Sequence, residues 1–279
     1  MLQNTKIAII GPGVMGRTLV ASLIHAGGCP PAEIAIAGPN PLRLDELCTE
    51  FLVSGSTSNR QVMEEADVVI LAIKPQRLAQ VANGARGAIR PDALLISIMA
   101  GVSIEALRRS FGVERVVRSM PNTPAQIGMG ITVWAQSSAV SPEQHALAAS
   151  IFQTLGQEIF VEDEDYLDMA TALSGTGPAY VFLFMEAMID AGVHMGFPRR
   201  IAEQLVVQTL KGSVEYYDHN HEHPASLRNE VTSPGGTSAE ALYYLEKAGF
   251  RTAISRAIWA AYQRSKELGE GRNKQNLEG

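Results

Sequence analysis

The chain has 279 residues, of which 19% are charged, and a formal net charge of −6 at neutral pH. This length predicts two domains, and the negative charge provides no general attraction to nucleic acid or to an anionic membrane. The two cysteines, Cys29 and Cys48, stand far apart, which excludes a disulfide framework and is typical of a reducing compartment. No signal peptide is visible and no apolar run approaches the ~20 residues of a membrane span, so we expect a soluble, cytoplasmic protein without nucleic-acid or membrane partners.

Short apolar runs alternate with helical patterns in the N-terminal part of the chain. The predicted strands are Lys6–Ile10, Glu33–Ala37, Asp67–Ile73, Leu94–Ile98, Val113–Arg118, Ile131–Ala135 and Gln157–Val161. The first four are nearly continuously apolar, as strands covered on both faces are. We therefore expect residues 1–162 to form an α/β dinucleotide-binding domain with a doubly wound, Rossmann-like, mostly parallel sheet.

The first strand runs directly into a glycine motif, G-x-G-x-x-G, at the start of a helical pattern. Gly11 permits the tight turn, Gly13 lets a pyrophosphate approach the backbone, and Gly16 lets helix and strand pack closely. Val14 and Met15 begin the helix, whose free N–H groups would bind the phosphates. We expect nucleotide binding here rather than a plain glycine-rich turn.

The end of the second strand bears on which nicotinamide cofactor is used. A carboxylate is expected there, about 20 positions after the glycines, when the ribose 2′-hydroxyl of NAD is bound. This chain has Asn40 and then Arg43, with no carboxylate at the strand end, which favours the 2′-phosphate of NADP. NADPH is thus the expected cofactor, with NADH used less well. The alternative is that Asn40 only makes a turn and Arg43 lies on a solvated helix face.

The strand Asp67–Ile73 ends at the carboxyl edge of the sheet, where ligands bind in such folds. Lys74, between Ala72 and Pro75, is therefore a candidate neighbour of a phosphate or of the nicotinamide ribose. A strand-end lysine that only meets solvent fits the pattern equally well.

The strand signal disappears from residue 163, and an all-α domain is expected over residues 163–279. Its predicted helices are Pro178–Met195, Arg199–Tyr217, Thr237–Lys247 and Arg251–Leu268. The segment Ala179–Met185 is apolar on every side, which predicts a helix buried all round. A small helical domain can bury such a helix by pairing with another subunit, so we expect a homodimer or higher homo-oligomer built through this domain.

Three further segments contain more glycine, proline and small hydroxyls than ordinary connections need: Ser119–Pro124, Ser174–Tyr180 and Ser233–Ser238. Together with the glycine motif and the segment Ala72–Pro75, they resemble pyrroline-5-carboxylate reductase. The resemblance runs from Lys6 to about Lys266. It implies the last step of proline biosynthesis, in which a reduced nicotinamide cofactor converts the cyclic imine 1-pyrroline-5-carboxylate to L-proline. Because a protonated C=N is already electrophilic, this reaction requires no metal.

The residues of the segment Ser233–Ser238 also indicate a function without reference to the family. Gly235 and Gly236 expose backbone N–H groups before a helix whose first turn has the capping-box pattern of Thr237 and Glu240. Such a helix start favours an anion such as the substrate carboxylate. If Thr237 caps the helix, Ser238 is freer to face the substrate. An ordinary capped helix is the alternative.

The resemblance adds roles to individual residues. It implies that the amides of this loop bind the substrate carboxylate and that a hydroxyl of Thr237 or Ser238 lies near the ring nitrogen. Many relatives have threonine where this chain has Ser238. Asn59 would contact the adenosine ribose. Glu222 is either a residue that positions the loop or a solvated carboxylate.

The two remaining motifs are expected to line the cleft. Ser174–Tyr180 is interpreted as a helix break followed by a new start at Pro178, which sets Thr176, a candidate catalytic residue, against the nicotinamide and the imine. Met120 and Asn122 would line the opposite side, and the amide of Asn122 serves either the cofactor or loop backbone.

Other interpretations are weaker. His219, His221 and His223 are typical of an exposed loop beside Pro224, and no metal site is expected. Alternative functions are the reduction of a related cyclic imine, a β-hydroxyacid dehydrogenase using Lys211 as acid, and a non-catalytic nicotinamide-binding regulator. Lys211 lacks the glycine-rich and asparagine neighbourhood of the dehydrogenase class. A pure binder has no use for a carboxylate pocket that faces the nicotinamide.

Overall fold

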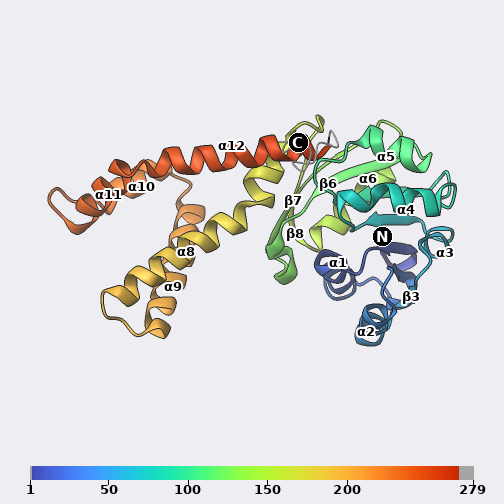
Figure 1. Cartoon of the computed structure of the whole chain (residues 1–279), viewed down its shortest axis with the longest axis horizontal. Helices are drawn as coiled ribbons and strands as arrows, with labels where there is room; N and C mark the ends of the chain where they lie inside the picture. The colour runs from blue at the N-terminus through green and yellow to red at the C-terminus, as the bar shows by residue number, and fades with distance from the viewer. Residues whose placement is uncertain (1, 270–279) are drawn as a thin grey trace, which may run out of the picture. The chain divides into compact units, whose positions relative to one another are not determined.

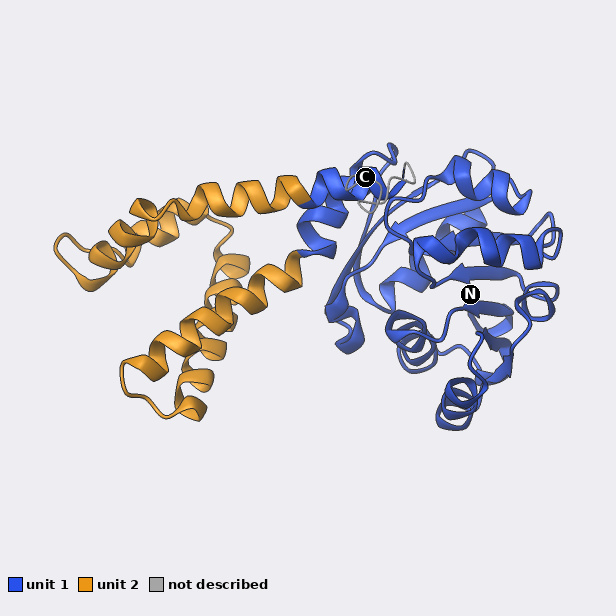
Figure 2. Ribbon diagram, in the orientation of Figure 1, with its two compact units in different colours: residues 1–176, 261–279 blue, residues 177–260 orange. Residues whose placement is uncertain are grey.

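A computed structural model describes residues 2–269 of the chain (Figure 1). The described residues form two compact units: one holds those up to Thr176 and from Ala261 onward, and the other is Gly177–Ala260 (Figure 2). The first unit contains the sheet and the second is helical. The boundary therefore lies later than the domain boundary expected at residue 162, and the packing of residues 163–176 explains why, as described below.

In the described part of the chain, eight strands form one sheet in the order β3-β2-β1-β4-β5-β6-β7-β8. All neighbouring strands are parallel except β6 and β7, which are antiparallel. The strands are β1 Ile7–Ile10, β2 Ile34–Ala37, β3 Ser54–Ser56, β4 Val68–Leu71, β5 Leu94–Ser97, β6 Val116–Met120, β7 Gly130–Gln136 and β8 Gly156–Phe160. The expected mostly parallel, doubly wound sheet is confirmed.

Alternate residues of the central strands build two separate cores, one on each face of the sheet. Ile7 and Ile9 face one core, which is covered by α1 Val14–His25, α2 Pro41–Phe51 and α6 Pro142–Gln153. Ala8 and Ile10 face the other, which is covered by α3 Asn59–Met63, α4 Leu78–Ala85 and α5 Ile104–Phe111. Because both faces are covered, β1, β2 and β4 are apolar at every position.

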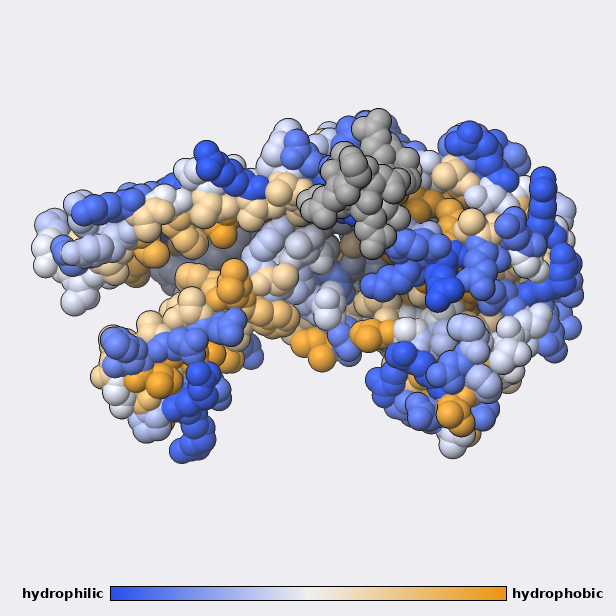
Figure 3. Space-filling model, viewed as in Figure 1, coloured by the Kyte–Doolittle hydropathy of each residue, from blue (hydrophilic) through white to orange (hydrophobic). Residues whose placement is uncertain are grey.

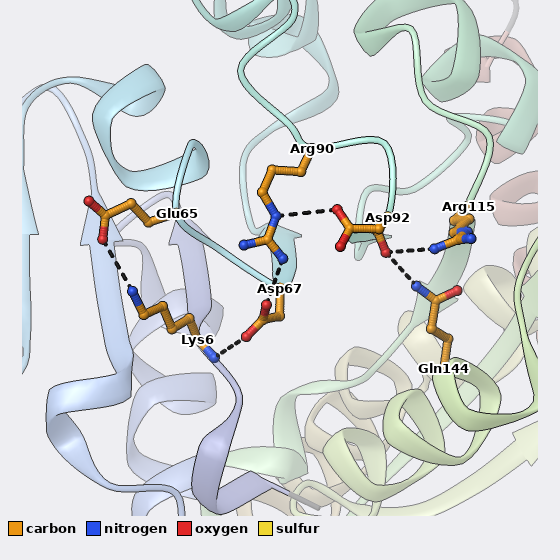
Figure 4. A network of polar contacts seen from close by, with 7 residues as sticks. All are labelled: Lys6, Glu65, Asp67, Arg90, Asp92, Arg115 and Gln144. Atoms are coloured by element: carbon orange, nitrogen blue, oxygen red, sulfur yellow. Dashed lines mark hydrogen bonds and ion pairs between the residues drawn. The ribbon is translucent and has the colours of Figure 1, made fainter.

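The amino edge of the sheet is closed by polar contacts of the chain itself (Figure 4). The Asp67 carboxylate accepts from the backbone N–H of Lys6 at 2.8 Å and from the Arg90 guanidinium at 2.7 Å. The hydrogen bond that Arg90 donates to Asp67 raises the pKa of Arg90, and Asp92 adds to the effect. These contacts join the starts of β1, β4 and β5. The amino edge is thus occupied by internal pairs, and ligand donors must be sought at the opposite edge.

A buried ion pair holds residues 164–168 and the end of α12 Phe250–Gly269 against the sheet. The Arg118 side chain, on β6, is 4% exposed and lies 3.0 Å from the Asp168 carboxylate. The same Asp168 oxygen accepts from the hydroxyl of Ser265 at 2.6 Å. Glu164, 3.7 Å from Arg118, also accepts from the Ile104 N–H. These contacts are the reason that residues 163–176 belong to the first unit.

The expected helix break at Ser174–Tyr180 is wrong. α7 Tyr166–Ala170, a π-helical turn Thr171–Gly175 and α8 Gly177–His194 follow one another as one helical stretch. The hydroxyls of Thr171 and Ser174 donate to the carbonyls four residues earlier, at 2.7 and 3.0 Å. Small and hydroxyl-bearing residues here loosen the regular hydrogen bonding without ending the helix, and such π turns are frequent at functional sites.

The helical unit is built from α8, α9 Arg199–Asn220, α10 Pro224–Glu230, α11 Thr237–Lys247 and the first part of α12. α8 packs on α9, where Gly192 meets Ala202. The α10 helix was not expected, because His221–Pro224 resembles a loop. His221 ends α9 in the left-handed conformation (φ 53°), and the imidazole of His223 accepts from the Ala225 N–H to start α10.

The expectation that α8 is buried all round is wrong for the single chain. Val181, Phe182, Leu183 and Phe184 are 51%, 60%, 67% and 39% exposed. Figure 3 shows hydrophobic side chains along the visible surface of this unit. Among the described residues, the helical stretch 166–194 is long and apolar enough to cross a membrane by length and composition, although no apolar run of that length was expected from the sequence. Helices that pair subunits meet the same criterion, because they also present apolar side chains outside their own chain.

Candidate active site

The glycine turn lies at the carboxyl edge of the sheet, between β1 and α1. Gly11 has φ 113°, and its N–H donates to the Ala37 carbonyl at 2.8 Å, which ties the turn to the end of β2. A side chain at Gly11 would overlap the Ala72 carbonyl, and one at Gly16 would overlap the carbonyl of Gly11. Both glycines are therefore required by the packing of strand, turn and helix.

The start of α1 offers free backbone donors beside open space. Gly13 is the N-cap and provides no side-chain hydrogen bond, so the first N–H groups of the helix, at Val14 and Met15, are left without a cap. An added Cβ at Gly13 would meet no atom within 4 Å, and Val14 is exposed. Uncapped donors, a positive helix end and room for an approaching group fit a dinucleotide pyrophosphate.

A pocket of ≈ 330 Å³ lies at the same edge. Its lining combines the sequence-predicted Gly11 and Asn59 with residues at or after the ends of β1, β2, β3 and β4 and at the start of α4: Ile10, Ala37, Gly38, Pro39, Thr57, Ile73, Arg77, Gln80 and Val81. Gly38 is needed in this wall because a side chain there would overlap Pro12 of the glycine turn. The pocket has the size of a small-molecule site, and its apolar floor suits a purine ring.

Asn40 and Arg43 are placed differently from the expectation that assigned them to NADP. The Asn40 side chain caps α2, accepting from the N–H groups of Leu42 and Arg43 at 3.1 and 3.4 Å. The Arg43 side chain is exposed, and neither residue lines the pocket. The alternative drawn from the sequence placed Arg43 on a solvated helix face, as observed, and made Asn40 a turn residue, whereas Asn40 caps α2.

The residues after β4 lie beside the glycine turn. The backbone of Ala72 contacts Gly11, and Ala72 donates to the Ile10 carbonyl at 2.8 Å. Lys74 is exposed and is the N-cap of a short 3₁₀ helix, η3 Pro75–Arg77, that leads into α4. Lys74 does not line the pocket, whereas Arg77, three residues later, does.

Asn122 is committed to loop backbone. Its amide nitrogen donates to the Ser174 carbonyl at 3.2 Å, and its amide oxygen accepts from the Ile131 N–H at 2.9 Å. Beside this contact Met120 packs against Gly175, where an added side chain would clash with the Met120 methyl group. The structure thus brings the Met120–Asn122 motif and the π turn together within the first unit.

The hydroxyl of Thr176, the last residue of that unit before α8, is also engaged. It donates to the Thr171 carbonyl at 2.8 Å, as does its backbone N–H. Thr176 is half-buried, and its oxygen keeps only acceptor capacity for a further partner.

The expected capping box at Thr237 is not formed. The N-cap of α11 is Gly236, one residue earlier, so Thr237 is the first helical residue and no side chain caps the helix. Gly235 has φ 72°, a conformation that makes glycine the natural residue at the turn. The hydroxyls of Thr237 and Ser238 and the first N–H groups of α11 are therefore free of the capping role. Glu222 is exposed, between the ends of α9 and α10.

Sequence reasoning missed Thr57, Arg77 and Gln80 of the pocket. Thr57 follows β3, Arg77 directly precedes α4 and Gln80 lies in the first turn of α4, and no glycine pattern or strand-end carboxylate points to them. Only the folding of α3 and α4 onto one face of the sheet brings them together. Among residues 2–269, no group of three or more histidine, cysteine or acidic residues is arranged to hold a metal ion.

A doubly wound sheet with a glycine turn, an uncapped helix start and a pocket at its carboxyl edge defines a dinucleotide-binding protein. Residues 6–101 match the family model described as NADP oxidoreductase, coenzyme F420-dependent. Residues 164–268 match the model for pyrroline-5-carboxylate reductase dimerisation.

Relatives that span the whole chain carry the same name. A pyrroline-5-carboxylate reductase of Synechocystis is 44% identical over 269 residues, covering 96% of this chain and 100% of the relative. The crystal structure of the Plasmodium falciparum pyrroline carboxylate reductase with NADP bound matches with a TM-score of 0.89 and 33% identity, covering 96% and 100% of the two chains. The reductase structure from Coxiella burnetii has a TM-score of 0.85 and 36% identity, covering 95% and 98%. The chain belongs to the pyrroline-5-carboxylate reductase family.

Proposed function

We propose that the chain reduces 1-pyrroline-5-carboxylate to L-proline by binding the substrate carboxylate at the start of α11. The observation that carries this proposal is the uncapped N-terminus of α11 after Gly235 and Gly236. In this eleven-residue helix the first backbone donors have no side-chain partner, and the helix dipole adds a positive partial charge. A single carboxylate can accept hydrogen bonds from these backbone donors and interact favourably with this positive partial charge.

The chain's own residues then act on the imine. When bound at the carboxyl edge of the sheet, the reduced nicotinamide supplies the hydride that adds to the C=N carbon. The protein must hold the ring and keep a proton at its nitrogen, since the protonated imine is the better electrophile. Ser238 and Thr237 carry hydroxyls in the first turn of α11 that no cap consumes, and they are the proposed partners of the ring nitrogen. Thr176, whose proton is donated to Thr171, serves only as an acceptor.

Cofactor preference, assembly and location complete the proposal. NADPH is preferred over NADH, because no carboxylate lines the pocket at the end of β2. The exposed apolar surface of α8 and the match to a dimerisation model support a homo-oligomer formed through the helical unit. Cytoplasmic location is inferred from the two unpaired cysteines.

The test is NADPH oxidation in the presence of 1-pyrroline-5-carboxylate, comparing wild type with Ser238→Ala and Thr237→Ala. At least one variant should lose about 10²-fold in kcat/KM, the usual contribution of a positioned proton donor or acceptor. Ser213→Ala is the matched control, because this exposed hydroxyl donates only to a carbonyl of its own helix. NADPH binding should be unchanged in all three variants.

Two results would count against this proposal. Wild-type turnover with both alanine variants fully active would remove the assigned roles of the α11 hydroxyls. Tight NADPH binding without turnover would indicate another imine substrate. The β-hydroxyacid dehydrogenase alternative gains no support, since its candidate acid, Lys211, is exposed on α9.

A further inference from the structure

We propose that Arg77 is the residue that selects NADPH over NADH, by pairing its guanidinium with the 2′-phosphate of the cofactor. This inference rests on the proposed use of a nicotinamide cofactor at the carboxyl edge of the sheet. It replaces Arg43, the arginine to which the sequence assigned this preference. The starting observation is that Arg77 lines the pocket there, whereas Arg43 does not.

The electrostatics of the pocket single out Arg77. Among the described residues that line it, Arg77 is the one with a charged side chain, and no aspartate or glutamate is present. Its charge has no carboxylate partner within 4 Å among residues 2–269. Its Nη1 donates to the neutral amide oxygen of Gln80 at 2.8 Å. A cation without a counter-ion beside a ligand pocket favours a dianion over a neutral hydroxyl.

The remaining polar side chains of the pocket can also donate. Thr57 and Asn59 lie in the same lining, and neither side chain has a hydrogen-bond partner among the described residues. A hydroxyl, an amide and a guanidinium offer several N–H or O–H groups to one site. Such a set suits the oxygens of a phosphate monoester, whereas a ribose hydroxyl needs only one partner.

The hydrogen bond to Gln80 helps to orient the arginine. Arg77 precedes α4, and Gln80 is three residues later, on the first turn of that helix. Holding one N–H on Gln80 leaves the other guanidinium donors for a ligand. Lys74 and Arg43 are the competing cations at this edge; like Arg77 they are exposed, but they lie outside the pocket lining.

The experiment is calorimetric titration of the full-length protein with 2′,5′-ADP and, separately, with 5′-ADP. The two ligands are isomers that share adenosine 5′-phosphate. The second phosphate is at the 2′ position in 2′,5′-ADP and is attached to the 5′-phosphate in 5′-ADP. For Arg77→Gln we expect 2′,5′-ADP to bind about 10- to 100-fold more weakly, the usual effect of losing a charge-assisted hydrogen bond, with 5′-ADP binding unchanged. Arg43→Gln is the matched control and should leave both affinities unchanged. Unchanged 5′-ADP binding also verifies that the variant is folded.

Salt dependence gives a second readout. Wild-type affinity for 2′,5′-ADP should fall more steeply with ionic strength than affinity for 5′-ADP, and Arg77→Gln should remove that difference. Equal weakening of both ligands in Arg77→Gln would mean that Arg77 stacks on the adenine, and the proposal would be overturned. It would equally be overturned if Arg43→Gln produced the selective loss or if neither variant changed binding. Failure of wild type to bind either nucleotide would instead refute the cofactor site itself.

Discussion

The two units of this protein differ in how far their apolar residues are exposed in the single chain. In the sheet unit, every residue of β1 and β4 is at most 1% exposed, and two cores are closed by helices of the same chain. In the helical unit, four consecutive apolar residues of α8 are between 39% and 67% exposed. The central strands of the sheet unit are therefore covered within one chain. The helical unit needs another surface to cover α8, and its match to a dimerisation model supports a second copy.

The largest expected effect comes from placing a charge on this α8 surface. Phe182→Glu should weaken association by roughly 4 kcal/mol or more, because a buried aromatic anchor is replaced by an unpaired carboxylate in each copy of the interface. Light scattering after size exclusion should report a monomer. Ile127→Glu, at a position of the sheet unit that is 75% exposed, is the control and should keep the wild-type mass. A wild-type mass for Phe182→Glu would show that α8 is not the covered surface.

The second-largest expected effect is a loss of stability, and it tests the ion pair between Arg118 and Asp168 in the sheet unit. Arg118→Met leaves the largely buried Asp168 carboxylate without its charged partner, which should lower the free energy of unfolding by ~3–5 kcal/mol. Urea denaturation at fixed protein concentration measures the change. Arg17→Met, which removes an exposed pair with Glu50, should cost about 1 kcal/mol or less. Equal losses in the two variants would contradict the structural role of Arg118.

Replacing one leucine in each unit by alanine compares the stability of the two units directly. Leu19→Ala, in the closed core, should cost ~2–5 kcal/mol at any protein concentration. Leu183→Ala, on α8, should cost about 2 kcal/mol when the protein is concentrated and little when it is dilute, because its contacts form only on association. Thermal melts over a range of protein concentrations distinguish the two. A loss of stability for Leu183→Ala that does not depend on protein concentration would contradict this difference between the two units.

The smallest effect concerns the end of β2. Asn40→Ala removes the cap of α2 and should lower stability by about 1 kcal/mol. Because the Asn40 side chain does not line the pocket, the ratio of NADPH to NADH affinity should stay unchanged. Fluorescence titration with both cofactors measures this ratio. A selective loss of NADPH binding would return Asn40 to the cofactor site.

Features carried by local backbone chemistry could be predicted from the sequence. The glycine motif, the apolar strands and the mostly parallel sheet follow from residue type and period alone. The strand β3 was missed because Ser54–Ser56 is polar, as a strand at the edge of a sheet can be. The π turn at Thr171–Gly175 was also missed, since small and hydroxyl residues favour a break and an irregular helix alike.

Residues that belong to the site because of distant neighbours could not be ranked from the sequence. Arg43 and Arg77 are both arginines near a strand end, and only the packing of α3 and α4 on one face of the sheet places Arg77 in the pocket. Asn122 offered an amide to cofactor or backbone, and its partners Ser174 and Ile131 are decided by the tertiary structure.

The sequence by itself determined the dinucleotide-binding class, the family and the glycine-rich start of α11, because these depend on backbone conformations that few residue types allow. Tertiary structure alone decided that α11 begins at Thr237 without a side-chain cap, that Arg118 is buried with Asp168, and that the α8 surface is left open in a single chain. The physical reason is the same in each case. Burial and pairing depend on which surfaces meet, and a local pattern records only that a surface is available.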